Sequence, residues 1–298
     1  MGRPLAPMHT VRELAAFPEL GVDYIVFKDT DGTVYAKNGR TGKIEFRHSL
    51  LSSILSQIYD VHADGVSIVL AGQYDEKITI QTGTRLNGIN KYQTYIKKIN
   101  INGGHRIKLE NLKVKEIAID VSSSSLIDSV FRDLWVYGDD TTTGLSITGT
   151  ANEVTTLVLE NVFFEHYATC VSVERPSDIL YINAVFENSG TGIYKGSGRH
   201  ILLKCWFESL TTGLDLIGSS YVTLIEPKFT NVTTPISMTE EYGYNPKYTV
   251  LGLESILQNF VIPTTQPSNP IPGSMYFDTS TGDLYVYDGS AWKKVTLT

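Results

Sequence analysis

Apolar and polar positions repeat with a period of 21 or 22 residues through the second half of the chain. A phenylalanine marks the same position in four similar segments: Phe164, Phe186, Phe207 and Phe229. The residue two positions before each marker carries no charge, the residue five positions before it is Leu or Tyr, and a Thr follows five positions after it. With some drift, the pattern extends back to Val136 and Val114. A repeat of this length is typical of a solenoid or an array.

Within each repeat the alternation of apolar and polar residues is that of β-strands. Val, Ile, Thr and aromatic residues dominate, and turn residues interrupt the apolar runs at short intervals. Two or three short strands per repeat predict one rung of a parallel β-helix, in which equivalent side chains stack about 4.8 Å apart. Inward columns of Phe, Leu and Ile then form one continuous core. A leucine-rich repeat has a similar period, but its Leu-x-x-Leu-x-Leu frame is not visible, so it ranks second.

A second column predicts the turns between strands. Three positions before the marker the sequence has Asn111, Asp133, Asn161 and Asn183. Asn and Asp tolerate a left-handed backbone, which a sharp turn between two strands of a rung requires. The column departs to Lys204 and Glu226, so a different turn could occur there.

The residues before the repeats predict a tail and a cap. Residues 1–20 look like a tail or tag with a short helix at 11–20, and residues 21–62 form a β-meander followed by a helix. Three segments have strand character: 24–28, 33–37 and 43–46. Apolar residues between Leu50 and Val61 have helical spacing, with Ser49 as the expected N-cap. Because a β-helix must cover the open end of its core, this helix is predicted to cap the β-helix of residues 63–260.

The composition changes after residue 260. Residues 261–272 are rich in Pro, Thr and Ser and predict an extended linker. Residues 273–298 predict a three-stranded meander with strands at 274–277, 284–287 and 291–297. A sheet of this size is too small to bury a core by itself.

Two parts of the chain resemble viral proteins. The meander YIVFKDTDGTVYAKNGRTGKIEF, the amphipathic segment after it and DGVSIVLAGQYDEKITI resemble the opening of pectate-lyase-like β-helix proteins from archaeal viruses and proviruses and of phage tailspikes. Asp64-Gly65 replaces the usual Gly pair, and TRLNGINKYQT at 84–94 resembles the second-rung signature. The resemblance covers residues 22–115 clearly and the later rungs by pattern. It implies an all-β fold: a pectin-lyase-like, right-handed parallel β-helix with a helix cap and a small C-terminal meander.

The C-terminal segment carries a separate resemblance. GSMYFDTSTGDLYVYDGSAW, residues 273–292, is similar to an element near the ends of viral tail fibres and virion surface proteins. This similarity implies a place on the virion surface, or outside the cell after release.

Composition and residue spacing argue against several classes of protein and several kinds of site. A net charge of −7 with 19% charged residues argues against a nucleic-acid binder, which would carry a basic stripe. No apolar run approaches 18 residues, so no membrane insertion is expected, and the N-terminus lacks the apolar region of a Sec signal peptide. Cys170 and Cys205 belong to different columns, so we expect no disulfide. No CxxC or HExxH spacing occurs, so neither a metal nor a cofactor is predicted.

Candidate chemistry lies on the outward side of the marker strand, because residues on either side of the marker point away from the core. The substrate-binding candidates are aromatic: Trp135, Tyr137, Phe163 and Trp206. The catalytic candidates are carboxylates: Glu165, Glu187, Glu208 and Asp215. Aromatic rings stack on sugars, and glycosidases place two carboxyl groups about 5–9.5 Å apart. Alternatively, a neighbouring subunit covers the aromatic residues with the glutamates at its rim, or the face is solvated. Asp215 could pair with Glu208, although a solvated strand position is more usual for Asp.

We interpret the sequence as that of a virion-associated, tailspike-like protein that recognises a host-surface glycan and forms a homotrimer. One alternative is a glycoside hydrolase on the same scaffold, and another is a purely structural fibre or decoration protein. Fold alone does not separate these classes. We favour a binder over an enzyme because the sequence fixes no acid–base partner for the glutamates.

Overall fold

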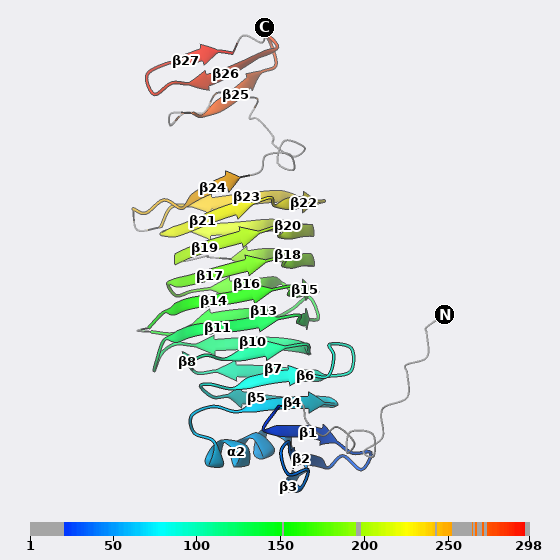
Figure 1. Cartoon of the computed structure of the whole chain (residues 1–298). Helices are drawn as coiled ribbons and strands as arrows, with labels where there is room; N and C mark the ends of the chain where they lie inside the picture. Colours follow the sequence, from blue (N-terminus) through cyan, green and yellow to red (C-terminus); the bar gives the residue numbers. More distant parts are fainter. Residues whose placement is uncertain are drawn as a thin grey trace, which may run out of the picture. The chain divides into compact units, whose positions relative to one another are not determined.

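The computed structural model describes residues 21–150, 152–194, 198–241, 243–251 and 273–295, together with residues 264, 266 and 270. The chain divides into two compact units, Met1–Leu253 and Glu254–Thr298. The first unit is a right-handed parallel β-helix of about eight turns, and the second contains a small antiparallel sheet (Figure 1). The predicted fold class is therefore confirmed, and the leucine-rich alternative does not describe the chain.

Two parallel sheets run along the β-helix, and each turn contributes to both. The first sheet contains β4 (Ser67–Ala71), β6 (Arg85–Gly88), β9 (Lys108–Glu110), β11 (Leu126–Arg132), β14 (Val154–Glu160), β17 (Ser177–Ile182), β19 (Gly198–Leu203), β21 (Ser220–Ile225) and β24 (Lys247–Leu251), with the short β8 (Gly104–His105) beside β11. The second sheet contains β5 (Gln73–Ile80), β7 (Tyr95–Ile101), β10 (Lys113–Asp120), β12 (Trp135–Tyr137), β13 (Thr143–Thr148), β15 (Phe163–Glu165), β16 (Thr169–Val173), β18 (Val185–Tyr194), β20 (Trp206–Ile217), β22 (Lys228–Thr230) and β23 (Thr234–Thr239).

The marker phenylalanines form the predicted inward column. Phe164, Phe186, Phe207 and Phe229 are paired in register on β15, β18, β20 and β22. All four are buried, and consecutive rings stack with centroids 5.4, 4.8 and 4.9 Å apart. A Cβ added to Gly192 would lie 3.0 Å from the Phe207 ring and 2.5 Å from the carbonyl oxygen of Gly213. Glycine is therefore required where the backbone approaches the ring stack.

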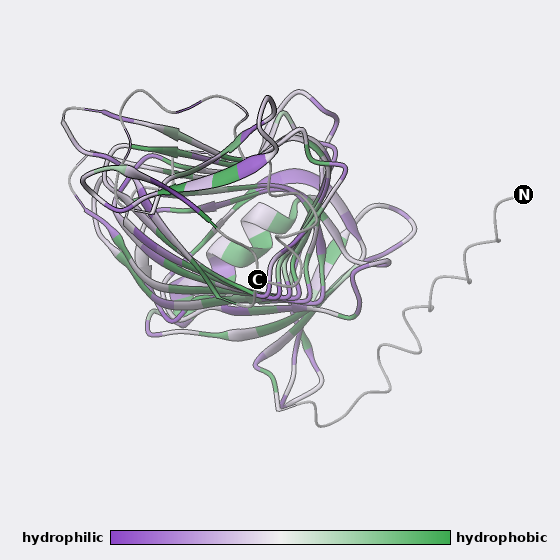
Figure 2. Cartoon of the chain, turned by 90° about the horizontal axis from the view of Figure 1, so that it is seen from above, coloured by the Kyte–Doolittle hydropathy of each residue, from purple (hydrophilic) through white to green (hydrophobic). Residues whose placement is uncertain are grey.

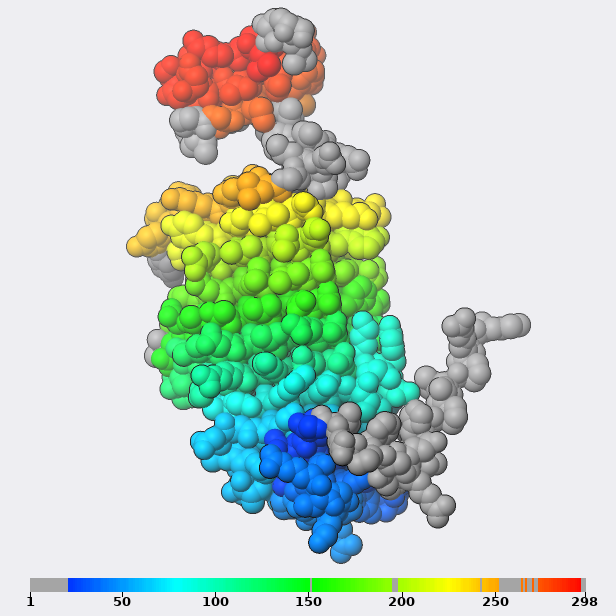
Figure 3. All heavy atoms as spheres, in the orientation of Figure 1, coloured from blue at the N-terminus to red at the C-terminus, as the bar shows by residue number. Residues whose placement is uncertain are grey.

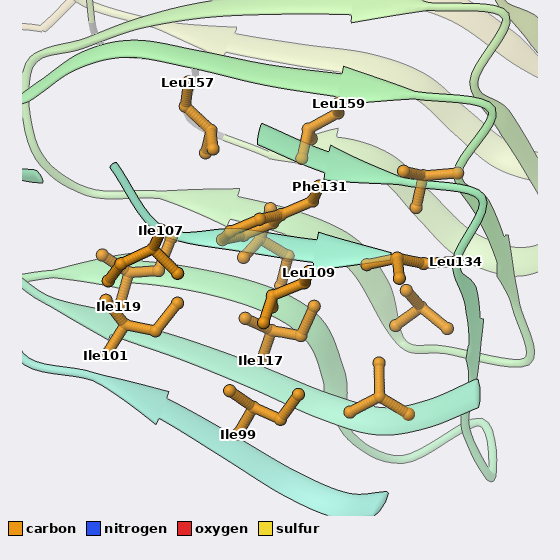
Figure 4. Close-up of a cluster of buried hydrophobic side chains, with 14 of the residues drawn as sticks. Ile99, Ile101, Ile107, Leu109, Ile117, Ile119, Phe131, Leu134, Leu157 and Leu159 are labelled. Atoms are coloured by element: carbon orange, nitrogen blue, oxygen red, sulfur yellow. The ribbon is translucent and has the colours of Figure 1, made fainter. Parts of the chain in front are cut away.

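Earlier turns use aliphatic columns in the same way. Ile99 pairs in register with Ile117 on the second sheet, while Leu109, Phe131 and Leu159 are in register on the first. All five side chains are buried and point toward the interior between the sheets (Figure 4). Among the described residues, one main apolar core thus runs through the β-helix from Tyr24 to Phe229.

The predicted corner column is present in every later turn. Asn111, Asp133, Asn161 and Asn183 have φ angles of 55°, 54°, 54° and 51°. The departure at Lys204 and Glu226 does not change the turn, since their φ angles are 54° and 50°. The left-handed region costs about 1–2 kcal/mol for residues with a Cβ. Rung stacking therefore imposes the corner even on residues that do not favour it.

A second left-handed corner follows the marker and has no uniform sequence signature. His166, Asn188, Ser209 and Asn231 lie two positions after the marker phenylalanines, with φ angles of 63°, 46°, 54° and 53°. The corner interrupts each rung directly after the outward glutamate position. It separates the segment that carries Glu208 from the segment that carries Asp215 within β20.

The N-terminal end of the core is capped as predicted. Helix α2 (Leu51–Val61) buries Leu51, Ile54, Leu55 and Ile58 in the main core, and it lies within the outline of the coil when viewed along the axis (Figure 2). The expected N-cap, Ser49, is wrong: Leu50 occupies that position without a capping side chain. Instead, the Glu76 carboxylate on β5 accepts the backbone N–H groups of Leu51 and Ser52 at 2.8 and 3.0 Å. A carboxylate there stabilises the positive end of the helix.

The β-meander before α2 extends the first sheet. β1 (Tyr24–Lys28) pairs in parallel with β4, and β2 (Val34–Asn38) and β3 (Ile44–His48) follow it in antiparallel fashion. The predicted helix at 11–20 lies outside the described residues, as does most of the linker at 261–272. Cys170 and Cys205 are buried free thiols.

The second unit is the predicted three-stranded meander. It consists of β25 (Met275–Asp278), β26 (Asp283–Tyr287) and β27 (Trp292–Lys294). Tyr276 stacks on Tyr285 with centroids 5.1 Å apart and meets the Trp292 ring edge-on at 4.9 Å. Within the described residues 273–295, no side chain reaches full burial. The unit thus has aromatic contacts but no closed core of its own.

Candidate functional site

The structure brings most of the predicted site residues onto one outward face of the second sheet. The first outward column, in register, is Lys113, Trp135, Phe163, Val185, Trp206 and Lys228. The second is Tyr137, Glu165, Glu187, Glu208 and Thr230. Both columns follow from strand alternation around the marker residues.

A groove lies along the first outward column. It has a volume of about 380 Å³ and is lined by Lys91, Tyr92, Trp135, Asn161, Val162, Phe163, Asn183 and Val185. Lys91 and Tyr92 belong to the loop 89–94 between β6 and β7, which projects from the side of the β-helix (cyan in Figures 1 and 3). The Tyr92 ring meets the Trp135 ring edge-on at 6.0 Å. The sequence did not predict that the loop 89–94 lines the groove, because the loop lies outside the repeat and has no pattern that places it beside Trp135.

Three of the four predicted aromatic residues are already covered by lysines. The Lys113 ammonium lies 4.0 Å from the centroids of both Trp135 and Tyr137. Burial lowers the pKa of Lys113, although Glu165 opposes this effect. The Lys228 ammonium lies 3.8 Å from the centroid of Trp206, which does not line the groove. Among the described residues, no cation lies over the Phe163 ring, so Phe163 differs from the other three predicted aromatic residues in having no lysine on its face.

The three glutamates form the predicted ladder, and the contacts of Glu165 and Glu187 differ. Glu165 accepts a hydrogen bond from Trp135 Nε1 at 3.3 Å and lies 3.4 Å from His166 Nε2. Asn188 Nδ2 donates to Glu187 at 3.2 Å. Burial, followed by repulsion from Glu165 and Glu208, raises the pKa of Glu187 above its usual value. The surroundings of Glu187 therefore favour its protonated form.

Asp215 is not part of this ladder. It is in register with Tyr194 and Ser237, in the segment of β20 that follows the corner at Ser209. The suggested pairing of Asp215 with Glu208 is absent from the hydrogen bonds and ion pairs of the described residues. Asp215 instead occupies a half-buried strand position.

The described residues offer no metal centre: they contain no cluster of three or more His, Cys, Asp or Glu side chains able to hold an ion. Among them, too, no helix is long and apolar enough to cross a membrane.

Comparisons with known proteins give little further information. No protein-family model matches the chain, and no curated protein matches its sequence. Among solved structures, the chain is similar to ORF18 of Geobacillus virus E2, with 13% identity over 99% of both chains and a TM-score of 0.35. A similarity of this degree carries no argument about function.

Proposed function

We propose that the chain is a virion-associated, tailspike-like protein that binds a host-surface glycan in the groove beside the loop 89–94. The groove itself carries the proposal: it has an apolar floor at Phe163 and Val185 and a polar edge at Asn161 and Asn183. Small-molecule sites combine apolar walls with a few polar groups in this way and have volumes of about 300–1,000 Å³. A sugar ring has an apolar face and a hydroxyl rim, which suit this floor and edge.

The polar edge can still form hydrogen bonds with a ligand. Asn161 Nδ2 donates to Asp133 Oδ1 at 3.1 Å, and Asn183 Nδ2 donates to Asn161 Oδ1 at 3.3 Å. Each amide group has two N–H donors and one carbonyl acceptor. One N–H of each Asn and the carbonyl of Asn183 are therefore available to sugar hydroxyls.

The assignment to a virion rests on sequence resemblance. Residues 22–115 resemble viral β-helix proteins, and residues 273–292 resemble a tail-fibre element. A homotrimer is part of this proposal, and it is supported by the second unit, where no described side chain is fully buried. Packing between three copies would supply the core that one copy lacks.

Substitution at Phe163 tests the binding proposal. A glycan array is probed with the full chain and with Phe163→Ala, and Trp206→Ala serves as the matched control from the same outward column outside the groove. We expect the wild type to retain a polysaccharide, Phe163→Ala to lose at least tenfold in affinity, and Trp206→Ala to retain it. Equal losses in both variants would contradict binding confined to the groove. No retained polysaccharide at all would favour a purely structural fibre protein.

Glycoside hydrolysis is the second candidate, and one observation favours it. Glu187 has a raised pKa and lies between Glu165 and Glu208 in adjacent rungs. A carboxyl with a raised pKa beside a second carboxyl is an arrangement that acid–base hydrolysis uses. Product analysis on a retained polysaccharide decides the matter: cleavage that is lost in Glu187→Gln would establish an enzyme.

A further inference from the structure

The groove has a local charge opposite to that of the molecule. Lys91 is the one charged side chain in its lining, and no carboxylate contributes to that lining. The chain as a whole carries a net charge of −7, and the glutamate ladder occupies the adjacent second column. The groove is therefore a cationic site on an acidic protein.

Lys91 has no internal partner for its charge. Within the described part of the chain, no carboxylate lies within ion-pair distance of its ammonium group, and its nearest aromatic centroid, that of Tyr92, is 5.8 Å away. Three lysines of the second sheet are ion-paired: Lys97 with Asp75 at 3.2 Å, Lys98 with Glu116 at 2.7 Å and Lys115 with Asp139 at 2.7 Å. Lys91 differs from them in having an ammonium group free to bind an external anion.

The loop holds Lys91 in a defined position. Asn90 Oδ1 accepts the backbone N–H groups of Tyr92 and Gln93 at 2.8 and 3.0 Å. At the base of the loop, Leu70 O accepts the backbone N–H of Ile89 at 3.0 Å and the hydroxyl of Thr94 at 3.0 Å. A loop ordered before binding reduces the entropy that a ligand must overcome.

We propose that the groove selects an acidic saccharide unit, one that carries a carboxylate or sulfate group, and that Lys91 is the residue that determines this selectivity. The proposal rests on the glycan-binding function proposed above. The sugar ring lies against Phe163, its hydroxyls meet Asn161 and Asn183, and its anionic group pairs with Lys91. The glutamates of the second column repel that group, so charge orients the saccharide toward the loop.

An array that contains neutral, carboxylated and sulfated polysaccharides tests this assignment. The full chain is compared with Lys91→Gln, which keeps most of the side-chain length without the charge. Lys228→Gln is the matched control, because Lys228 lies over Trp206 outside the groove. We expect the wild type to retain carboxylated or sulfated polysaccharides, and Lys91→Gln to bind them at least tenfold more weakly, which corresponds to about 1.4 kcal/mol. Lys228→Gln should bind as the wild type does.

The array outcomes separate the two proposals. In one outcome the wild type retains neutral polysaccharides, Phe163→Ala loses this binding and Lys91→Gln keeps it. That result would overturn the proposal of an acidic saccharide but would still support glycan binding in the groove. Retention of an acidic polysaccharide that Lys91→Gln does not weaken would also overturn the role of Lys91. No retention at all would overturn the proposed function and this inference together.

Among supporting outcomes, the carboxylated and sulfated polysaccharides on the array identify which anionic group is bound. Binding that weakens between 50 and 500 mM NaCl in the wild type, but not in Lys91→Gln, would further support the ion pair.

Discussion

The inward and outward sides of the same short strands follow different rules. Inside, Phe164, Phe186, Phe207 and Phe229 repeat one residue type in one stacked column. Outside, the neighbouring column changes from Trp135 to Phe163, Val185 and Trp206, and lysines cover two of its rings. The inward side repeats because each ring must match the ring above and below it, whereas an outward residue needs no such match. The irregular outward positions are therefore where binding properties can vary without loss of the fold.

The largest effect should come from the inward column. Phe207→Ala removes a fully buried ring that stacks on two neighbours, and such losses cost about 3–5 kcal/mol. The outward control Trp206→Ala, at the adjacent position on the same strand, should cost clearly less. Denaturant unfolding of both variants measures the difference, and equal losses would contradict the distinction between the two sides.

A smaller effect should follow from filling the space beside the ring stack. Gly192→Ala places a Cβ 3.0 Å from the Phe207 ring and 2.5 Å from a backbone oxygen, so the rungs must shift. Overpacking of this kind costs about 1–3 kcal/mol. Thr191→Ala, one position earlier, adds no atoms and should cost less. A Gly192→Ala protein as stable as the wild type would show that the rungs have room at this point.

The smallest effect should come from the outward glutamate ladder. Because the folded state raises the pKa of Glu187 above 4.5, folding favours its protonated form, and ionisation opposes folding. Stability should therefore fall as the pH rises from 4.5 through the raised pKa. Glu187→Gln should remove this part of the pH dependence and stabilise the protein at pH 7 by no more than about 0.5 kcal/mol, since the group is largely solvated.

Thermal unfolding between pH 4 and pH 8 measures this dependence. Glu174→Gln, at an exposed position, serves as the control and should keep the wild-type profile. An unchanged profile in Glu187→Gln would mean that neither burial nor the neighbouring glutamates raise the pKa of Glu187.

The sequence was sufficient for structural features whose residue type repeats from rung to rung, and insufficient for features without such a repeat. The marker column, the corner at Asn161 and Asn183 and the two outward columns all follow from the 21- or 22-residue period. The second corner recurs in four rungs but was missed, because its residues are of three types, in the order His166, Asn188, Ser209 and Asn231. The cap of α2 was misassigned because Glu76 comes from a distant strand rather than from the adjacent residues.

The site was predicted only in part, for a similar reason. Phe163 and Trp135 were found from alternation, but Lys91 and Tyr92 reach the groove from a loop that precedes Trp135 by more than one turn. Trp206 and Phe163 occupy equivalent positions in the repeat, yet Lys228 covers one ring and the groove exposes the other. Whether an outward ring is covered depends on the side chains around it in the structure. The alignment of equivalent positions in the repeat does not show this.

Amide hydrogen exchange with and without a bound glycan tests the central claim most directly, namely that one groove on the outward face is the binding site. The full chain is labelled alone and with the polysaccharide that the array retains. We predict slower exchange in the loop 89–94 and in residues 161–163 and 183–185, and unchanged exchange at residues 206–208. Protection confined to residues 206–208, or no protection in the loop, would contradict the account.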